Sequence, residues 1–256
     1  MRGRFQAAMP WLTSWLIEDW QQDDKTSAAP YGCTMTEGHG EIALFPLDTV
    51  LVPGLVFPLH IFEPRYRQLL RDVLAQPEED REFGVVAVRS TSVDGSPWHR
   101  IGTTARIGEV DAYPDGRSDI TTVGHRRFEV ESVISEEPYL RARVRWLPED
   151  TQIAGDDPQT RTAALRATAL FARYRGLLSR DDSSVDDLPD DPHLLSYVLT
   201  AAIVAPTAWR QQLLECTTTS DRLSAACGFL VKEVQALAVL PSLPFEPPSP
   251  GPGDLN

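Results

Sequence analysis

The sequence predicts an α+β protein in which a strand-rich part precedes a helical part. Residues 41–150 contain runs with the period of two that half-buried strands show. Residues 158–240 instead space their apolar side chains three and four apart, as amphipathic helices do. Of the 256 residues, 42% are hydrophobic and 24% are charged, which is the composition of a globular chain with enough apolar side chains for a core.

The first strands are predicted from β-branched residues and from one turn. The run 83–88 is rich in valine, which indicates a buried strand. Residues 101–113 and 117–123 flank Pro114-Asp115-Gly116. In such a turn the proline fixes φ and the glycine accepts a positive φ, so the two flanking segments are expected to form a hairpin.

The strands predicted at residues 127–134 and 140–146 carry opposite charges on one face. An antiparallel hairpin folded about residue 137 places these charges in facing pairs: Glu129 with Arg145, and Glu131 with Arg143. Each such pair contributes roughly 0.2–1 kcal/mol. We therefore expect a solvent-exposed face that neutralises itself, rather than an anion site built from its arginines.

One helix interrupts the strands, and four more follow them. Over residues 63–74, Pro64 occupies the first helical turn, where its missing N–H leaves no bond unmade, and a single apolar stripe follows. The later helices are predicted at residues 158–179, 192–204, 207–215 and 220–239. In the first of these, the candidate buried positions include Leu165, Ala169, Ala172 and Leu177.

The ends of the chain and one linker differ in composition from the rest. Residues 1–40 are expected to be a poorly ordered extension, with Met35 as the true start or a loosely docked helix as the alternatives. The stretch 181–191 holds six Asp and is expected to be a solvated loop, because no bidentate Glu closes a calcium loop there. Residues 241–256 hold six prolines and are expected to form a disordered tail.

Charge and cysteine usage restrict the partners and the compartment. The chain has 37 acidic and 24 basic residues, and its net charge of -13 repels the phosphates of DNA and of nucleic acid in general. The longest apolar runs are far shorter than a bilayer requires, so no membrane association is expected. The three cysteines, Cys33, Cys216 and Cys227, form no disulfide framework, which fits a cytoplasmic protein.

The residues that catalysis requires are scarce. Only Lys25 and Lys232 are lysines, and neither follows a glycine, so the chain has no Walker A loop. A Ser-Lys dyad would have to use one of these two lysines. The five histidines are scattered without a zinc-ligand spacing, and there is no Gly-x-Ser-x-Gly motif. The sequence therefore predicts a non-enzymatic protein with no catalytic residues, no metal site and no cofactor.

The most unusual segment is 43–66, in which four prolines punctuate short apolar runs. Proline donates no hydrogen bond to a sheet, so these strands should be short or lie at an edge. An edge strand beside aromatic side chains can receive an extended peptide. The candidate contact residues are Phe57, His60, Phe62, Glu63 and Tyr66. For each, ordinary packing is the alternative: a core position for Phe62, and a charge at the helix N-terminus for Glu63.

The same segment resembles the start of the Lon protease N-terminal (substrate-binding) domain family. The resemblance rests on three runs: Phe45-Pro46-Leu47, Val52-Pro53-Gly54 and the nine residues Pro58 to Tyr66. Shorter similarities follow at Ile101-Gly102-Thr103 with Ala105, Asp115-Gly116-Arg117, Gly124 to Phe128, Pro138-Tyr139, Gln211 to Glu215 and Arg222-Leu223. Together they cover residues 41–240, and the first runs are the most specific.

The resemblance implies a PUA-like, β-barrel-type subdomain over residues 41–150 and a helical bundle over residues 158–240. In full-length Lon this domain helps to recognise unfolded or tagged polypeptides, while the ATPase and the Ser-Lys protease follow it. The present chain is similar to the small stand-alone bacterial members without those domains. It is therefore expected to be a polypeptide-binding or adaptor module, with a protease or a chaperone as a further partner. The resemblance implies no particular oligomeric state.

A PUA-like domain that binds a small molecule or contacts RNA is the alternative function. PUA-like barrels elsewhere bind such ligands, and Arg141, Arg143 and Arg145 could form a local cationic stripe. The net charge of -13 argues against RNA. Salt dependence separates the alternatives, because binding driven by phosphates weakens steeply with salt and apolar capture does not.

Overall fold

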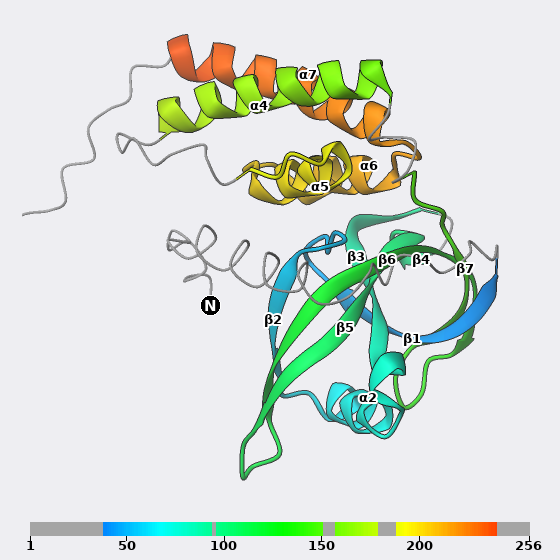
Figure 1. Cartoon of the computed structure of the whole chain (residues 1–256). Coiled ribbons are helices and arrows are strands. Elements are labelled where there is room, and N and C mark those ends of the chain that lie inside the picture. The colour runs from blue at the N-terminus through cyan, green and yellow to red at the C-terminus, as the bar shows by residue number, and fades with distance from the viewer. Residues whose placement is uncertain (1–37, 94–95, 151–156, 179–187, 240–256) are drawn as a thin grey trace, which may run out of the picture.

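The computed structural model describes residues 38–93, 96–150, 157–178 and 188–239, and it shows a mixed sheet followed by helices (Figure 1). The strands are β1 (His39–Leu47), β2 (Val56–Ile61), β3 (Glu82–Val93), β4 (Ser96–Trp98), β5 (Ile101–Ala112), β6 (Ser118–Ser135) and β7 (Arg141–Trp146). The α-helices are α2 (Pro64–Leu74), α4 (Pro158–Leu178), α5 (Pro192–Ala202), α6 (Thr207–Glu215) and α7 (Thr219–Val239), and a short 3-10 helix spans Glu78–Asp80. The expected N-terminal extension up to residue 37, most of the acidic loop and the proline-rich tail lie outside the described residues.

The sheet curls into a ring of strands. Its order is β1-β7-β6-β5-β3-β4, and β1 also pairs with β3. The β1–β3 pair is parallel, whereas the other pairings are antiparallel. Because β1 bonds to both β7 and β3, five strands close into a ring, while β2 and β4 each pair with one other strand of the described residues. The predicted combination of a strand-rich part and helices is confirmed.

Strand β6 is the organising strand of the sheet. The sequence predicted two strands here, separated near Gly124, but β6 runs without a break for 18 residues. Gly124 serves a close approach instead, since a Cβ at this position would lie 2.1 Å from the carbonyl oxygen of Val52. Residues 118–123 of β6 pair with β2 on one edge and with β5 on the other, and residues 128–129 pair with β7 and β5. Strands β2 and β7 therefore share the edge of β6 opposite β5.

The predicted charge pairing between β6 and β7 is half right. Glu129 lies opposite Arg145 and forms an ion pair with it, as predicted. The pairing of Glu131 with Arg143 was wrong, because the register shifts just before Ser132, which takes the place of Glu131 opposite Arg143. The shift is a β-bulge, in which one strand has an extra residue. Counting residues outward from the predicted turn at residue 137 cannot detect such an extra residue.

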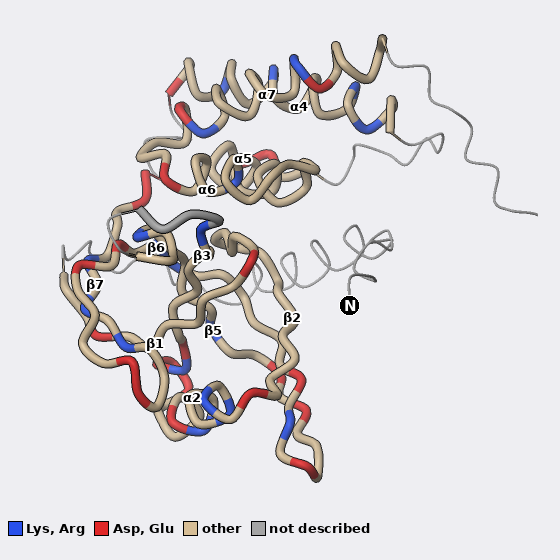
Figure 2. The backbone as a smooth tube through the Cα atoms, turned by 180° about the vertical axis from the view of Figure 1, so that it is seen from behind, with Lys and Arg blue, Asp and Glu red and all other residues tan. Residues whose placement is uncertain are grey.

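The arginines of β7 find their remaining partner on a third strand. Arg143 lies 3.4 Å and Arg141 lies 3.9 Å from the carboxylate of Glu41 on β1. Acidic and basic positions accordingly lie side by side around β7 (Figure 2). The face is neutralised as expected, although strand β1 contributes half of the pairing.

Helix α2 covers one end of the ring, and its predicted bounds are nearly those observed. It begins at Pro64 and ends at Leu74. The predicted stripe was Tyr66, Leu69, Leu70, Val73 and Leu74; the first four are buried, and Leu74 is partly buried against the same core. These pack with residues of β1, β3, β5 and β6 into one hydrophobic core inside the ring.

The other four helices form two layers beside the sheet. Helices α5 and α6 lie next to the strands, and α4 and α7 lie side by side on the far side of them (Figure 1). The predicted buried face of α4 was wrong, since Leu165 is 75% exposed and Leu177 is 41% exposed. The buried residues are Thr160, Ala164, Ala167, Phe171 and Tyr174, whose small alanines allow α7 to approach closely. None of the described helices is long and apolar enough to cross a membrane.

A buried polar cluster, which we call the polar joint, connects the strands to the helices. At its centre is Arg127 of β6, which is only 2% exposed. Its Nε donates to Glu149 at 2.6 Å, and its Nη1 donates to the carbonyls of Leu214 and Cys216 at 2.8 and 2.7 Å. These carbonyls lie at the C-terminus of α6, where helical carbonyls lack intrahelical partners and favour a cation.

A second arginine completes the polar joint from the helical side. Arg222 of α7 is fully buried, and its guanidinium lies 4.0 Å from the ring centroid of Tyr197. It donates to the carbonyls of Leu213 and Cys216, both at 3.1 Å. The hydroxyl of Tyr197 donates to Glu149 at 2.9 Å. Burial raises the pKa of Tyr197, which keeps this hydroxyl protonated as a donor.

We predict that replacing Arg127 with Met lowers the free energy of unfolding by about 3–5 kcal/mol. The substitution removes the buried guanidinium from the Glu149 carboxylate, which still accepts from the Tyr197 hydroxyl, and from the Leu214 carbonyl. The Cys216 carbonyl loses one of its two donors and keeps Arg222. Urea unfolding followed by tryptophan fluorescence measures the loss. Arg145→Met, which removes an exposed ion pair, is the matched control and should lose under about 1 kcal/mol. Equal losses in the two variants would contradict the central role of Arg127.

A second prediction concerns acid stability and rests on Glu82 of β3. Burial alone would raise the pKa of Glu82, but hydrogen bonds from His125 and Arg126 outweigh it and lower this pKa from 4.5 to about 2. The stabilisation is present above pH 4.5 and is lost as the pH falls from 4.5 toward 2. Glu82→Gln should therefore lose up to about 3 kcal/mol at pH 7 relative to the parent, with the difference vanishing near the lower pH.

The check is urea unfolding of parent and variant across that pH range. Glu78→Gln, at an exposed position in the 3-10 helix, is the control and should match the parent throughout. A stability difference for Glu82→Gln that is the same at both ends of the range would disprove the assignment.

Candidate functional site

The structure divides the five predicted contact residues between the core and the surface. Tyr66 is 8% exposed, and its ring stacks on Phe45 with 3.9 Å between centroids. Phe57 is half-buried against the same core. His60 is exposed, and Phe62 is 58% exposed, so the alternative of a core position for Phe62 was wrong. The two exposed rings belong to the end of β2 and the residue that follows it.

Strand β2 lies at an outer margin of the sheet (Figure 1). It pairs with β6, and no other strand in the described part of the chain pairs with its second edge. Pro58 lies within it, as proline in a sheet requires an edge position. Along the strand, Leu59 and Ile61 are less exposed than Pro58 and His60, which face outward. The second edge therefore presents backbone groups and outward side chains together.

Four side chains gather at the end of β2 and form what we call the edge cluster: His60, Phe62, Tyr113 and Asp119. The ring of His60 lies 5.9 Å from that of Phe62 and 6.4 Å from that of Tyr113, centroid to centroid. Asp119 holds two of these rings, because its Oδ1 lies 2.5 Å from His60 Nδ1 and its Oδ2 accepts the Tyr113 hydroxyl at 2.5 Å. Tyr113 itself is 42% exposed. The cluster is a fixed aromatic surface with one carboxylate at its centre.

Tyr113 and Asp119 were not among the predicted contact residues. The predicted turn does bring these two residues together, and Gly116 adopts the expected positive φ of 83°. Only the pairing of β2 with β6, however, sets His60 opposite Asp119. Hydrogen bonds from Tyr113 and then His60 lower the pKa of Asp119, so this carboxylate stays ionised. No local pattern in the sequence predicts a contact between two strands that are so distant in the sequence.

Glu63 occupies the N-cap position of α2 without capping the helix through its side chain. Instead its carboxylate lies 2.8 Å from Nη2 of Arg65. The guanidinium of Arg65 in turn lies 4.6 Å from the centroid of the Tyr66 ring. Glu63 therefore positions Arg65 at the start of the helix, next to a groove.

That groove, which we call the arginine groove, has a volume of about 580 Å³ and lies between β4, the end of β6 and the start of α2. Its aromatic walls are Tyr66, Trp98 and Tyr139. Its charged lining residues are Arg65, Arg89, Arg100, Glu131 and Glu136. Among the predicted contact residues, Tyr66 thus faces this groove, while His60 and Phe62 belong to the edge cluster.

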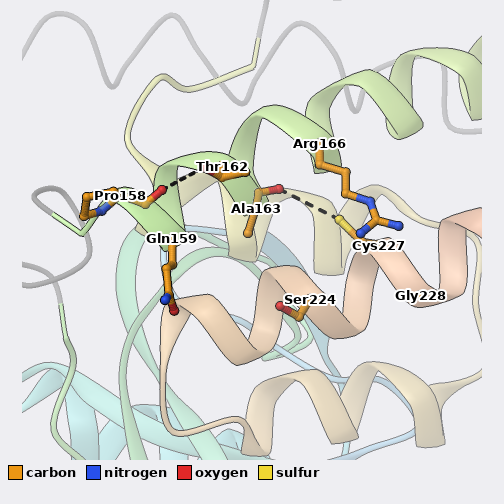
Figure 3. A pocket seen from close by; sticks show the side chains of 8 residues that line it. All are labelled: Pro158, Gln159, Thr162, Ala163, Arg166, Ser224, Cys227 and Gly228. Atoms are coloured by element: carbon orange, nitrogen blue, oxygen red, sulfur yellow. Dashed lines mark hydrogen bonds between the residues drawn. The ribbon is translucent and has the colours of Figure 1, made fainter.

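A second cavity of about 530 Å³ lies between α4 and α7 (Figure 3). Small residues of both helices line it, among them Ala163, Ser224 and Gly228. Cys227 borders it and lies 3.8 Å from the carbonyl oxygen of Ala163. Burial raises the pKa of the Cys227 thiol, which disfavours the thiolate that a nucleophile needs. Cys227 belongs to the helical core, as its apolar neighbours in the sequence suggest.

Glu149, Asp150 and His193 approach one another within 4.8 Å, as metal ligands can. The carboxylate oxygens already have partners: Glu149 accepts from Arg127 and Tyr197, and Asp150 accepts both the backbone N–H and the hydroxyl of Thr219, each at 2.7 Å. The guanidinium of Arg127 also supplies a positive charge at 2.6 Å from Glu149. These contacts make the trio an extension of the polar joint.

Comparison with known sequences points to one family. The model of the ATP-dependent protease La (LON) substrate-binding domain matches residues 41–232. "Lon protease 2" of Sorangium cellulosum is 26% identical over 209 residues, covering 77% of this chain and 25% of that protein. "Lon protease" of Flavobacterium johnsoniae is 34% identical over 123 residues, covering 46% and 15%. The chain thus spans a quarter or less of the length of these curated relatives.

Solved structures give the same result. A Lon N-terminal domain protein from Xanthomonas campestris is 28% identical, with a TM-score of 0.54, and the match covers 79% of this chain and 99% of that one. The N-terminal domain of a Mycobacterium avium complex Lon protease has a TM-score of 0.56, covering 77% and 98%. At 19% identity the second match shows the fold alone.

The burial of Tyr66 and the exposure of Phe62 give a prediction for these two aromatic residues of the segment 43–66. Tyr66→Ala should lower the free energy of unfolding by about 3 kcal/mol, because it empties a packed position against Phe45. Phe62→Ala should change it by less than about 0.5 kcal/mol, because its ring is largely in solvent. Denaturant unfolding of both variants decides the matter, and a large loss for Phe62→Ala would show that this ring is part of the core.

Proposed function

The chain belongs to the Lon substrate-binding domain family, and from this premise we propose that it is a polypeptide-binding module that captures extended segments along the second edge of β2. The observation that carries the proposal is that this edge, which no strand of the described residues pairs with, ends beside exposed aromatic rings. An extended segment can add to such an edge through main-chain hydrogen bonds, which do not depend on its sequence. That tolerance suits a module that handles many polypeptides.

The edge cluster supplies the apolar part of the contact. Phe62 and Tyr113 offer ring faces to side chains of the bound segment, and their positions are held by Asp119 and His60. Fixed aromatic rings lose little conformational freedom on binding, which makes them efficient contact residues. Glu63 and Arg65 extend the same surface to the start of α2. Phe57 and Tyr66 belong to the core inside the ring, against which β2 and α2 pack.

We extend the proposal to the partners. Unfolded or tagged polypeptides would be the bound clients, and a protease or a chaperone would receive them, which makes the protein an adaptor without catalysis of its own. The family match supports this, because it covers the substrate-binding domain and neither an ATPase nor a protease domain. A cytoplasmic location suits such clients.

The proposal also covers the division of the chain. Residues 41–150 would form a PUA-like, β-barrel-type subdomain, which the closure of the ring by β1 and β3 supports. Residues 158–240 would form a helical bundle, which the shared core of α4 to α7 supports. The alternative of RNA contact by the arginines of β7 is less well supported, because their charges are paired with Glu41 and Glu129.

The test uses a reduced and alkylated polypeptide that stays unfolded, labelled for fluorescence anisotropy. The double variant His60→Ala, Phe62→Ala should bind it about tenfold more weakly than the parent, because the aromatic contact surface is lost. Leu165→Ala is the control, since it removes an exposed apolar side chain from α4 and should bind as the parent does.

Thermal unfolding of each variant confirms that the comparison is between folded proteins. Unchanged affinity in the folded double variant would overturn the edge of β2 as the binding surface. A steep loss of binding with salt would point to a phosphate-bearing ligand instead.

A further inference from the structure

Two sides of the arginine groove are strand edges that have no partner strand in the part of the chain that the structure describes. Strand β5 begins at Ile101, opposite Glu129, and its line of hydrogen bonds to β6 ends with Val130 donating to the carbonyl of Arg100. Strand β6 continues for five more residues, 131–135, along which no described strand pairs on the β5 side. Residues 130–133 line the groove.

Strand β4 forms the opposite side of the groove. Its three residues, Ser96 to Trp98, pair with β3, and their other edge has no partner strand within the described ranges. All three residues line the groove. Two strand edges therefore face the same groove, and an extended chain lying in it could form hydrogen bonds with either of them.

The charge of the groove contrasts with that of the whole protein. Three arginines and two glutamates line it, whereas the chain as a whole carries a net charge of -13. Glu131 is already bonded, since its Oε2 lies 2.9 Å from Nδ1 of His39. Arg65 is paired with Glu63, as described above. Arg89, Arg100 and Glu136 also line the groove, and Arg100 is held there by contacts with the end of β6.

Arg100 is held in place by neutral groups. Its Nε donates to the carbonyl of Val130 at 3.0 Å, and its Nη2 lies 3.4 Å from the carbonyl of Glu131. Its contact with the carboxylate of Glu129 is long, at 4.0 Å. Carbonyl contacts position a guanidinium without cancelling its charge, and the side chain is 57% exposed. Such a group can accept a carboxylate in the two-bond geometry that guanidinium favours.

We propose that the arginine groove binds a carboxylate of an extended polypeptide, either an acidic side chain or a free C-terminus, with Arg100 as the partner of that carboxylate. The inference rests on the proposed function, because it assigns a second part of the same client to a second surface. Trp98 and Tyr139 offer walls to the apolar side chains that flank the carboxylate. Clients with a carboxylate near an apolar stretch are then preferred.

The two surfaces are close enough for one client to touch both. Arg65 lines the groove, and Phe62 of the edge cluster precedes it by three residues. Their Cα atoms are therefore no more than about 11 Å apart. An extended segment covers that distance with about three or four residues. The edge cluster contacts the apolar residues of the client, and the groove selects among clients by charge.

The test uses short fluorescein-labelled peptides of equal length and apolar content. One carries internal Glu residues with an amidated C-terminus, one replaces Glu by Gln, and one is the Gln peptide with a free C-terminus. The Glu peptide, the free C-terminus or both should bind at least about fivefold more tightly than the amidated Gln peptide, and this preference should shrink as salt rises from about 0.05 M to about 0.5 M. The two arms identify the source of the carboxylate.

Variants then locate the preference. Arg100→Glu should abolish it, whereas Arg100→Lys should retain much of it, because the charge remains. Arg173→Glu makes the same charge change at an exposed position of α4 and is the matched control. Ser132→Trp fills the groove from an exposed position, and it should weaken binding of the preferred peptide even if Arg100→Glu proves unstable.

The outcomes separate the two proposals. If all three peptides bind equally in the parent, or if Arg173→Glu abolishes the preference as Arg100→Glu does, the groove proposal is overturned while polypeptide binding stands. If neither the peptides nor the unfolded polypeptide bind, the proposed function itself fails. If the carboxylate preference persists in the His60→Ala, Phe62→Ala variant, the groove is supported as an independent site.

Discussion

The buried guanidinium of Arg127 is the interaction on which the arrangement of the strands and the helices depends. It projects from β6, the central strand, and bonds to the carbonyls that end α6 and to a carboxylate that also holds a tyrosine of α5. A charge removed from water in this way is stable only with its full set of partners, so the helical layer can occupy few positions against the sheet. The edge cluster and the arginine groove therefore lie on a sheet whose position against the helices is fixed.

The length of β6 explains why the sheet offers edges. With 18 residues, β6 is longer than each of its partner strands. Strands β2 and β7 therefore share one edge of β6, and β5 leaves part of the other edge unpaired by any described strand. Closure of the ring pairs most strand edges, and among the described residues the second edge of β2, the end of β6 and the short β4 have no partner strand. Each of these edges lies beside aromatic or arginine side chains. A protein with a strong negative charge thus combines a closed core with local surfaces suited to extended chains.

The features that could be predicted from the sequence were local ones, such as helix starts and turns. The features that could not be predicted depend on pairing between strands that are distant in the sequence. The start of α2 at Pro64 and the turn with a positive φ at Gly116 follow from the conformations that these two residue types allow, so their sequence signals were sufficient. The candidate site was half predicted. His60 and Phe62 proved exposed, but Tyr113 and Asp119 joined them only through the register of β2 on β6.

The sequence by itself therefore determined the class of the fold, the positions of most elements and the family to which the chain belongs, because these depend on periodicity, turns and short motifs. Tertiary structure alone decided which side chains pair with one another and which are exposed to solvent. The bulge before Ser132 moved Arg143 away from Glu131, and close packing of α7 on small alanines turned Leu165 outward. Register and helix rotation are set by the sum of many contacts across the whole core, and no short stretch of sequence contains that sum.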